Sequence, residues 1–87
     1  SGYIKEANKA SDLASLDAVK TAAVSAYVMA QKDAATSVTS ISYTSGENFA
    51  TVNGTQVTIT GFTNAVTLKT GGSASWASDT WTITSSD

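Results

Sequence analysis

The sequence predicts an α+β fold in which one long N-terminal α-helix packs on an antiparallel β-sheet meander of about four strands. Between Tyr3 and Lys32 there is no glycine or proline, and Ala, Lys, Leu and other strong helix formers dominate. From Val38 onward apolar residues alternate with Ser and Thr, the period of two that half-buried strands show. Asn53-Gly54, between two such alternating runs, is a strong hairpin signal because both residues tolerate positive φ.

The change of composition near Asp33 divides the chain into two structural parts. We expect the helix to cover residues 3 to 33, the sheet to cover residues 34 to 87, and residues 1 to 2 to be a remnant of an expression tag. A chain of 87 residues forms one domain with a small core. If continuous, the helix is ~45 Å long at 1.5 Å per residue, which is out of proportion to one small sheet. We therefore expect part of the helix to make contacts beyond the domain.

A helical period places most of the larger apolar residues of this segment in one broad stripe, which should lie on the sheet. The residues expected in helix–sheet packing are Leu13, Leu16, Val19, Ala23, Val24, Tyr27 and, at the end of the stripe, Ala30, with Trp81 and Ile83 from the last strand. Lys20 falls within the stripe, so its stem should pack while its ammonium reaches solvent. Glu6 with Lys9, and Asp17 with Lys20, are spaced to support the helix as charge pairs.

The opposite side of the helix carries mostly small side chains. They are Ala7, Ser11, Ala14, Ala18, Ala22 and Ser25, followed by Met29. Small residues let a second helix backbone approach closely, so this stripe is a candidate filament interface. The alternative is that Ala serves only as a good exposed helix former. In a second alternative, Ser11-Asp12 is an N-cap and the first turns form a separate segment.

The second half of the chain reads as short strands joined by tight turns. The expected strands contain Ile41 and Tyr43, residues 49 to 52, Val57 and Ile59, residues 66 to 68, and residues 81 to 84, with further turns at Gly71-Gly72 and near Ser78-Asp79. One face of such a sheet should pack on the helix and the other should face water. The residues expected under the helix are Ile41, Tyr43, Phe49, Val57, Ile59, Val66, Leu68, Trp81 and Ile83.

Composition excludes most catalytic chemistry. The chain has no His and no Cys, so neither a Ser-His-Asp triad nor a thiolate metal site can form, and we expect no enzyme activity, cofactor or metal. Five Lys, no Arg and no basic cluster, against seven acidic residues, make nucleic acid an unexpected partner. Asp79 alone is a weak candidate for calcium, which prefers six to eight oxygen ligands. Asn53-Gly54-Thr55 matches a glycosylation sequon, but turn formation explains it better.

Two tryptophans in so small a domain raise the question of sugar binding, because aromatic faces stack on pyranose rings. Trp81 alternates with Thr80 and Thr82, so we expect it in the core. Trp76 lies outside a clear alternation and is the candidate exposed ligand contact, as an isolated aromatic on a loop.

Three segments stand out when they are taken in order: Tyr3-Ile4-Lys5-Glu6-Ala7-Asn8-Lys9-Ala10, the Ala-rich continuation from Asp17 through Ala22 to Tyr27, and the late strand Asp79-Thr80-Trp81-Thr82-Ile83-Thr84-Ser85. In this order they resemble the type IV pilins. Pilins carry a Tyr-x-x-x-Ala/Ser segment just after the apolar half of their helix, then an Ala-rich stretch that ends in Tyr, and a late Trp-Thr-Cys-Thr strand. Ile83 stands where many pilins have the first Cys of a disulfide, so the chain resembles a minimal pilin without the disulfide-bounded loop.

The resemblance implies the C-terminal half of a longer helix, packed on a sheet that forms the head. It also implies a precursor with a methylated N-terminus, anchored in the inner or cytoplasmic membrane by an upstream apolar segment that this sequence lacks. Its partners would be other pilin subunits, which polymerise through their helices, and the pilus assembly machinery. The resulting fimbria on the bacterial surface would support cell adhesion and motility. Two alternatives stay open: a pseudopilin of a type II secretion system, and a small carbohydrate-binding module.

Overall fold

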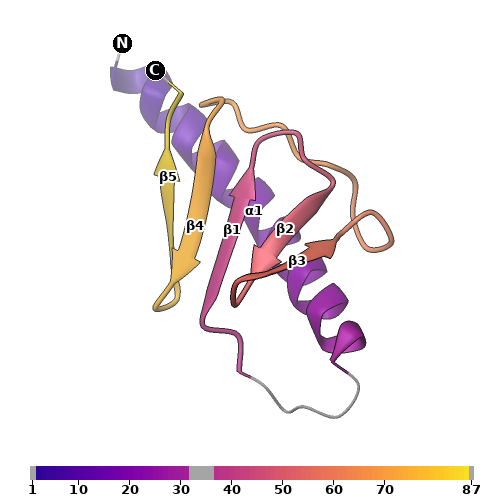
Figure 1. The fold of residues 1–87 in the computed structure, drawn as a ribbon. Helices are drawn as coiled ribbons and strands as arrows, with labels where there is room; N and C mark the ends of the chain where they lie inside the picture. Colours follow the sequence, from indigo (N-terminus) through magenta and orange to yellow (C-terminus); the bar gives the residue numbers. More distant parts are fainter. Residues whose placement is uncertain (1, 32–36, 87) are drawn as a thin grey trace.

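The structure, a computed structural model, describes residues 2–31 and 37–86. Within these residues one helix lies across one face of a five-stranded antiparallel sheet, which confirms the predicted α+β class (Figure 1). The elements are α1 (Gly2–Ala30), β1 (Ser40–Thr44), β2 (Phe49–Val52), β3 (Thr55–Thr58), β4 (Ser73–Ala77) and β5 (Thr80–Thr84). The helix is continuous through Ser11-Asp12, so these residues are not its N-cap. The predicted boundary at Asp33 lies outside the described residues.

The strands are not ordered as a simple meander. Their order across the sheet is β3-β2-β1-β4-β5, and every neighbouring pair is antiparallel. The β2–β3 hairpin and the β4–β5 hairpin therefore flank β1, and residues 59–72 carry the chain from one edge of the sheet to the opposite side of β1 (Figure 1). The expectation of about four sequential strands missed one strand and this crossover, because strand order depends on long-range pairing.

Both hairpins have two-residue turns at the positions that the sequence indicated. In the first turn Asn53 and Gly54 have φ of 50° and 82°, and in the second Ser78 and Asp79 have φ of 51° and 62°. Positive φ at both central residues is the signature of the type I′ turn, whose twist matches that of the flanking strands. The local chemistry of these residues is sufficient to place the two turns.

The strand expected over residues 66 to 68 does not form. This part of the chain is irregular, although the Leu68 side chain is buried. The Val66 N–H donates to the Tyr43 hydroxyl oxygen at 2.9 Å, and the Leu68 N–H donates to Ser45 Oγ at 2.8 Å. Because β1 is already paired on both sides, by β2 and β4, it has no free edge for a further strand. Residues 66–68 are held instead by hydroxyl groups at the end of β1.

The core lies between α1 and the inner face of the sheet, and residues from both parts of the chain form one cluster. It comprises Leu16, Val19, Ala22, Ala23, Tyr27, Ile41, Tyr43, Ala50, Val52, Val57, Ile59, Leu68 and Ala74, with Val24, Val66, Trp81 and Ile83 partly buried against it. Leu13 is half-buried. Ala30, the last residue of α1, is exposed, so the expected stripe ends one turn earlier.

Phe49 was expected under the helix, and this expectation is wrong. In β2 the buried positions are Ala50 and Val52, which pair with Val57 and Ile41 on the inner face. Since side chains alternate across a strand, Phe49 must point to the outer face, where it is half-buried. The sequence alone did not show which residues of this strand face the helix. Either alternating set, Phe49 with Thr51 or Ala50 with Val52, contains an apolar side chain that could be buried.

Candidate assembly surface on the helix

α1 presents a long surface that its own sheet does not cover. Residues 2–10 are exposed, apart from half-buried Asn8, and the first buried residue of the helix is Asp12. Tyr3 is 89% exposed and Ile4 is 63% exposed. The strands β2 and β3, which make most of the contact with α1, cross its C-terminal half (Figure 1). About the first third of the helix therefore forms a free surface.

The small residues of the candidate filament interface divide into three groups. Ala7, Ala14 and Ala18 are exposed, and Ser11 and Ser25 are half-buried. Ala22, by contrast, is 2% exposed and belongs to the core cluster, which corrects its assignment to the free side of the helix. The methyl side chain of Ala22 lets the sheet approach the helix closely.

Trp76 does not lie on a loop, which corrects the sequence-based expectation. It is in β4, pairs with Trp81 of β5, and is partly buried against the core. The Lys20 ammonium lies 4.9 Å from the centre of the Trp76 ring, within the range of a cation–π contact. Lys20 is half-buried, and its ammonium, which was expected to reach solvent, lies over the aromatic ring. Trp81 Nε1 is buried without a hydrogen-bond partner in the described part of the chain, so Trp81 contributes mainly packing.

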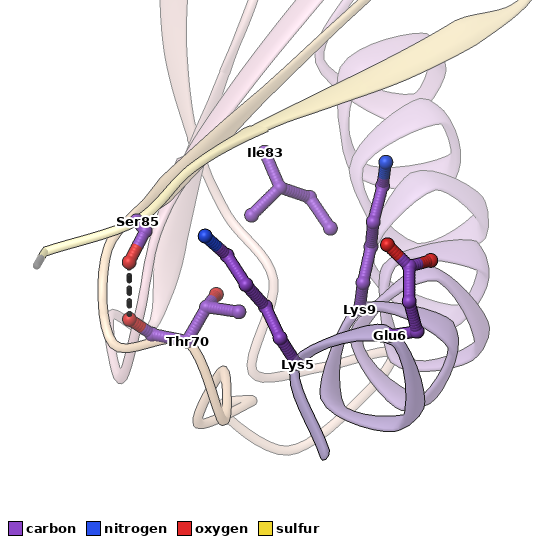
Figure 2. Close-up of a pocket in the computed structure, with 6 residues that line it drawn as sticks. All are labelled: Lys5, Glu6, Lys9, Thr70, Ile83 and Ser85. Carbon is purple, nitrogen blue, oxygen red and sulfur yellow. Dashed lines mark hydrogen bonds between the residues drawn. The ribbon is translucent and has the colours of Figure 1, made fainter. Parts of the chain in front are cut away.

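A shallow hollow of about 200 Å³ lies between the exposed end of α1 and the end of β5. Figure 2 shows Lys5, Glu6 and Lys9 on the helix side, and Ile83, Thr70 and Ser85 on the other. Ser85 Oγ donates to the Thr70 carbonyl oxygen at 3.4 Å. The charged side chains around the hollow are all exposed. The hollow is therefore an open site that carries two ammonium groups and one carboxylate.

No group of three or more His, Cys, Asp or Glu side chains is placed to hold a metal within residues 2–31 and 37–86. Among the same residues, α1 is the one helix long and apolar enough to cross a membrane by length and composition. A third of its most apolar window is buried in the domain, however, and core helices meet the same criterion.

Sequence reasoning missed the role of Asp12. Asp12 is 1% exposed, and its carboxylate accepts hydrogen bonds from the Lys69 N–H at 2.7 Å and from the Thr70 N–H and hydroxyl at 3.1 and 2.7 Å. Like the side chain of a helix N-cap, the Asp12 carboxylate accepts hydrogen bonds from backbone N–H groups, but these belong to the turn at Lys69 and Thr70, far away in the chain. Its position in the helix could have indicated this role. Asp12 lies one turn before Leu16 in the apolar stripe, where a buried carboxylate needs hydrogen-bond partners because an unpaired charge would be costly.

The environment of Asp12 lowers the pKa of its carboxyl group. Burial is the largest effect and raises the pKa, because it penalises the charged form. The hydrogen bonds from Lys69 and Thr70 stabilise the carboxylate, and the Lys69 charge adds to them. Together these favourable interactions outweigh burial, so the pKa lies below the usual 3.8. The residue is ionised at neutral pH and serves to join two segments.

Comparison with known proteins adds no assignment: no family model, no curated protein and no solved structure matches this chain.

Proposed function

We propose that this chain is the head and adjoining helix of a type IV pilin, a structural subunit that polymerises through its helices. The filament is extracellular and supports surface adhesion and twitching motility. The observation that carries the proposal is the uncovered first third of α1, with Tyr3 and Ile4 exposed at its start.

A helix end of this kind is poorly stabilised by its own domain. Most helical stability in proteins comes from packing an apolar face, and residues 2–10 are exposed within the described chain, apart from half-buried Asn8. A neighbouring helix would bury Tyr3 and Ile4. In a pilin the helix also continues upstream as an apolar segment, which would anchor the precursor in the inner or cytoplasmic membrane before assembly.

The exposed Ala residues suit helix-to-helix packing. Ala7, Ala14 and Ala18 share one side of α1 and are all exposed. Helix axes pack about 8–10 Å apart, and the shorter separation requires small side chains at the contact. This side of the helix therefore accepts a second helix without rearrangement of the core.

The sheet suits the outer surface of a filament. None of the five strands contains a charged residue, and the outer face is formed mostly by hydroxyl side chains. This uncharged layer lies on the side of the sheet away from α1 (Figure 1). In such a filament the helices would be buried in the interior, and the hydroxyl groups of the sheet would face water.

The test compares two Ala→Trp substitutions in the full-length gene of the source cell. Ala18→Trp places a large ring on the exposed helix side and should abolish or strongly reduce filaments seen by electron microscopy. Ala77→Trp, at an exposed position in β4, is the matched control and should leave filaments intact. Both purified domains should keep the melting temperature of the wild type. Normal piliation in the Ala18→Trp strain would contradict the proposal.

Two further observations separate the rival functions. A short basic leader, a Gly and an apolar stretch with one Glu near its start, all upstream of Tyr3, would support a pilin-like precursor. Calcium titration of the purified domain then distinguishes a pseudopilin, because the major pseudopilins bind calcium through clustered acidic loops. A carbohydrate-binding module is disfavoured, since Trp76 lies partly buried beneath Lys20.

A further inference from the structure

The edge strand β5 lacks the features that normally keep a sheet edge from pairing. It is the last strand in the order β3-β2-β1-β4-β5, at one side of the sheet (Figure 1). Its sequence, Thr-Trp-Thr-Ile-Thr, contains no charge and no proline, and its pairing with β4 continues without a bulge from Thr80 to Thr84. Natural edges are usually protected by one of these devices. An edge without them is a template for a further strand.

The register shows which backbone groups face this edge. Ala77 and Thr80 flank the two-residue turn and form its closing hydrogen-bonded pair. Hydrogen-bonded and non-hydrogen-bonded pairs alternate along an antiparallel ladder. Thr82 and Thr84 therefore also bond to β4, whereas the N–H and C=O groups of Trp81 and Ile83 point away from the sheet.

We propose that β5 pairs antiparallel with β5 of a second copy of this chain, around a two-fold axis at Thr82. The strand is almost symmetric about this residue: Thr80 and Thr84 are equivalent, and Trp81 and Ile83 are both large and apolar. In this register Trp81 lies opposite Ile83 of the second copy. All four outward N–H and C=O groups of each strand are then satisfied, by four hydrogen bonds in total.

The side chains match across the same axis. Thr82 lies opposite Thr82 of the second copy and Thr80 lies opposite Thr84, so hydroxyl side chains meet on the outer face. Trp81 and Ile83, half-buried at the open edge, meet on the helix side. Aromatic with β-branched pairs and Thr with Thr pairs both stabilise antiparallel neighbours. The net charge of −2 opposes association only weakly.

The other edge of the sheet fits a second copy less well. β3 has four residues, Thr-Gln-Val-Thr, with no such symmetry, and a turn begins two residues after it, at Thr60. Pairing through β5 alone buries less than the roughly 1,200 Å² of a stable interface, so the dimer should be weak. The proposal concerns the isolated domain and does not depend on the pilin assignment.

Sedimentation velocity on the purified domain, from about 10 µM to about 1 mM, tests the proposal, because a small interface gives weak association. The wild type should show a concentration-dependent dimer. Thr82→Lys and Thr82→Glu should each lower the association constant of the dimer by about tenfold or more, because like charges would lie directly opposite each other. An equimolar mixture of the two variants should restore dimers. Gln56→Lys, at an exposed position in the edge strand β3, is the matched control and should not alter association.

Amide exchange measured by NMR gives a second, residue-specific result. In dilute wild-type protein the Trp81 and Ile83 amides should exchange much faster than those of Thr80 and Thr82, and protection should rise with concentration. A wild type that stays monomeric at about 1 mM, where even a weak interface would associate, would overturn the proposal. So would association that Thr82→Lys leaves unchanged or Gln56→Lys abolishes. A charge-swapped mixture that remains monomeric would overturn the two-fold register.

Discussion

The carboxylate of Asp12 and the hydroxyl of Thr70 lie 2.7 Å apart, although 58 positions separate the two residues in the chain. This contact ties α1 to the crossover segment that connects the two hairpins. The crossover contains no strand, so its position depends on such side-chain anchors.

Replacement of Asp12 with Asn should lower the free energy of unfolding by about 1.5–3 kcal/mol, as expected for buried hydrogen bonds to a charged group. The side chain keeps one acceptor oxygen, but its amide nitrogen cannot accept the remaining N–H or hydroxyl donors. Asp17→Asn, at an exposed position on the same helix, is the control and should change stability by less than about 0.5 kcal/mol. Chemical denaturation measures both values. Equal effects of the two substitutions would show that the Asp12 contact is energetically minor.

The same residue should make stability depend on pH under acidic conditions. The pKa of Asp12 is lowered in the folded state, so its contribution is present above the unfolded-state value of 3.8 and is lost as the pH falls through the folded-state value. Unfolding free energies measured from pH 7 downward should therefore decline more steeply below about pH 4 in the wild type than in Asp12→Asn. Parallel curves for the two proteins would rule out this linkage.

Gly72→Ala should be strongly destabilising, by about 2 kcal/mol or more, as is typical of forced backbone shifts. A Cβ added at Gly72 would collide with the Thr84 carbonyl oxygen, and a backbone atom cannot yield as the end of a flexible side chain does. Gly61→Ala is the matched control, because its added Cβ meets nothing within 4 Å. It should be neutral or slightly stabilising, since Ala restricts the unfolded chain. Thermal unfolding of both variants checks the contrast.

Asn53→Gly separates the two roles of Asn53. Glycine keeps the positive φ of the turn but removes the side chain, whose Oδ1 accepts from the Thr39 N–H at 2.8 Å and whose Nδ2 donates to the Ser37 carbonyl oxygen at 2.8 Å. We expect the free energy of unfolding to fall by about 1 kcal/mol, because these hydrogen bonds are partly solvated. Asp79→Gly, at a positive-φ position in the other hairpin, should lower the free energy of unfolding much less than Asn53→Gly does. If both substitutions are neutral in denaturation experiments, Asn53 serves the turn alone.

The predictable parts of this fold are those decided by neighbouring residues. An uninterrupted run of helix formers marks α1, and Asn53-Gly54 and Ser78-Asp79 mark the turns, because these residues adopt the required φ at low cost. Helical spacing correctly placed Leu16, Val19, Ala23 and Tyr27 in the core. Each of these inferences needs only a few consecutive residues.

The errors concern residues whose environment comes from elsewhere in the chain. Ala22 is buried in the core cluster that α1 forms with the sheet, and Trp76 lies on the inner face because β4 pairs beside β1. A strand was expected at residues 66 to 68 because the local alternation allows one, but β1 had no free side. A local pattern shows which secondary structure a segment can form. It does not show which strand edge or helix face is still open to pair with that segment.

The amino-acid sequence by itself determined one long helix, two tight hairpins and a core drawn from both, because propensity, alternation and turn chemistry act over short distances. The tertiary structure alone decided the strand order, the burial of Asp12 against the crossover and the exposure of the first third of α1. These features depend on which segments compete for the same sheet edge and the same face of the helix. That competition is settled only when the whole chain has folded.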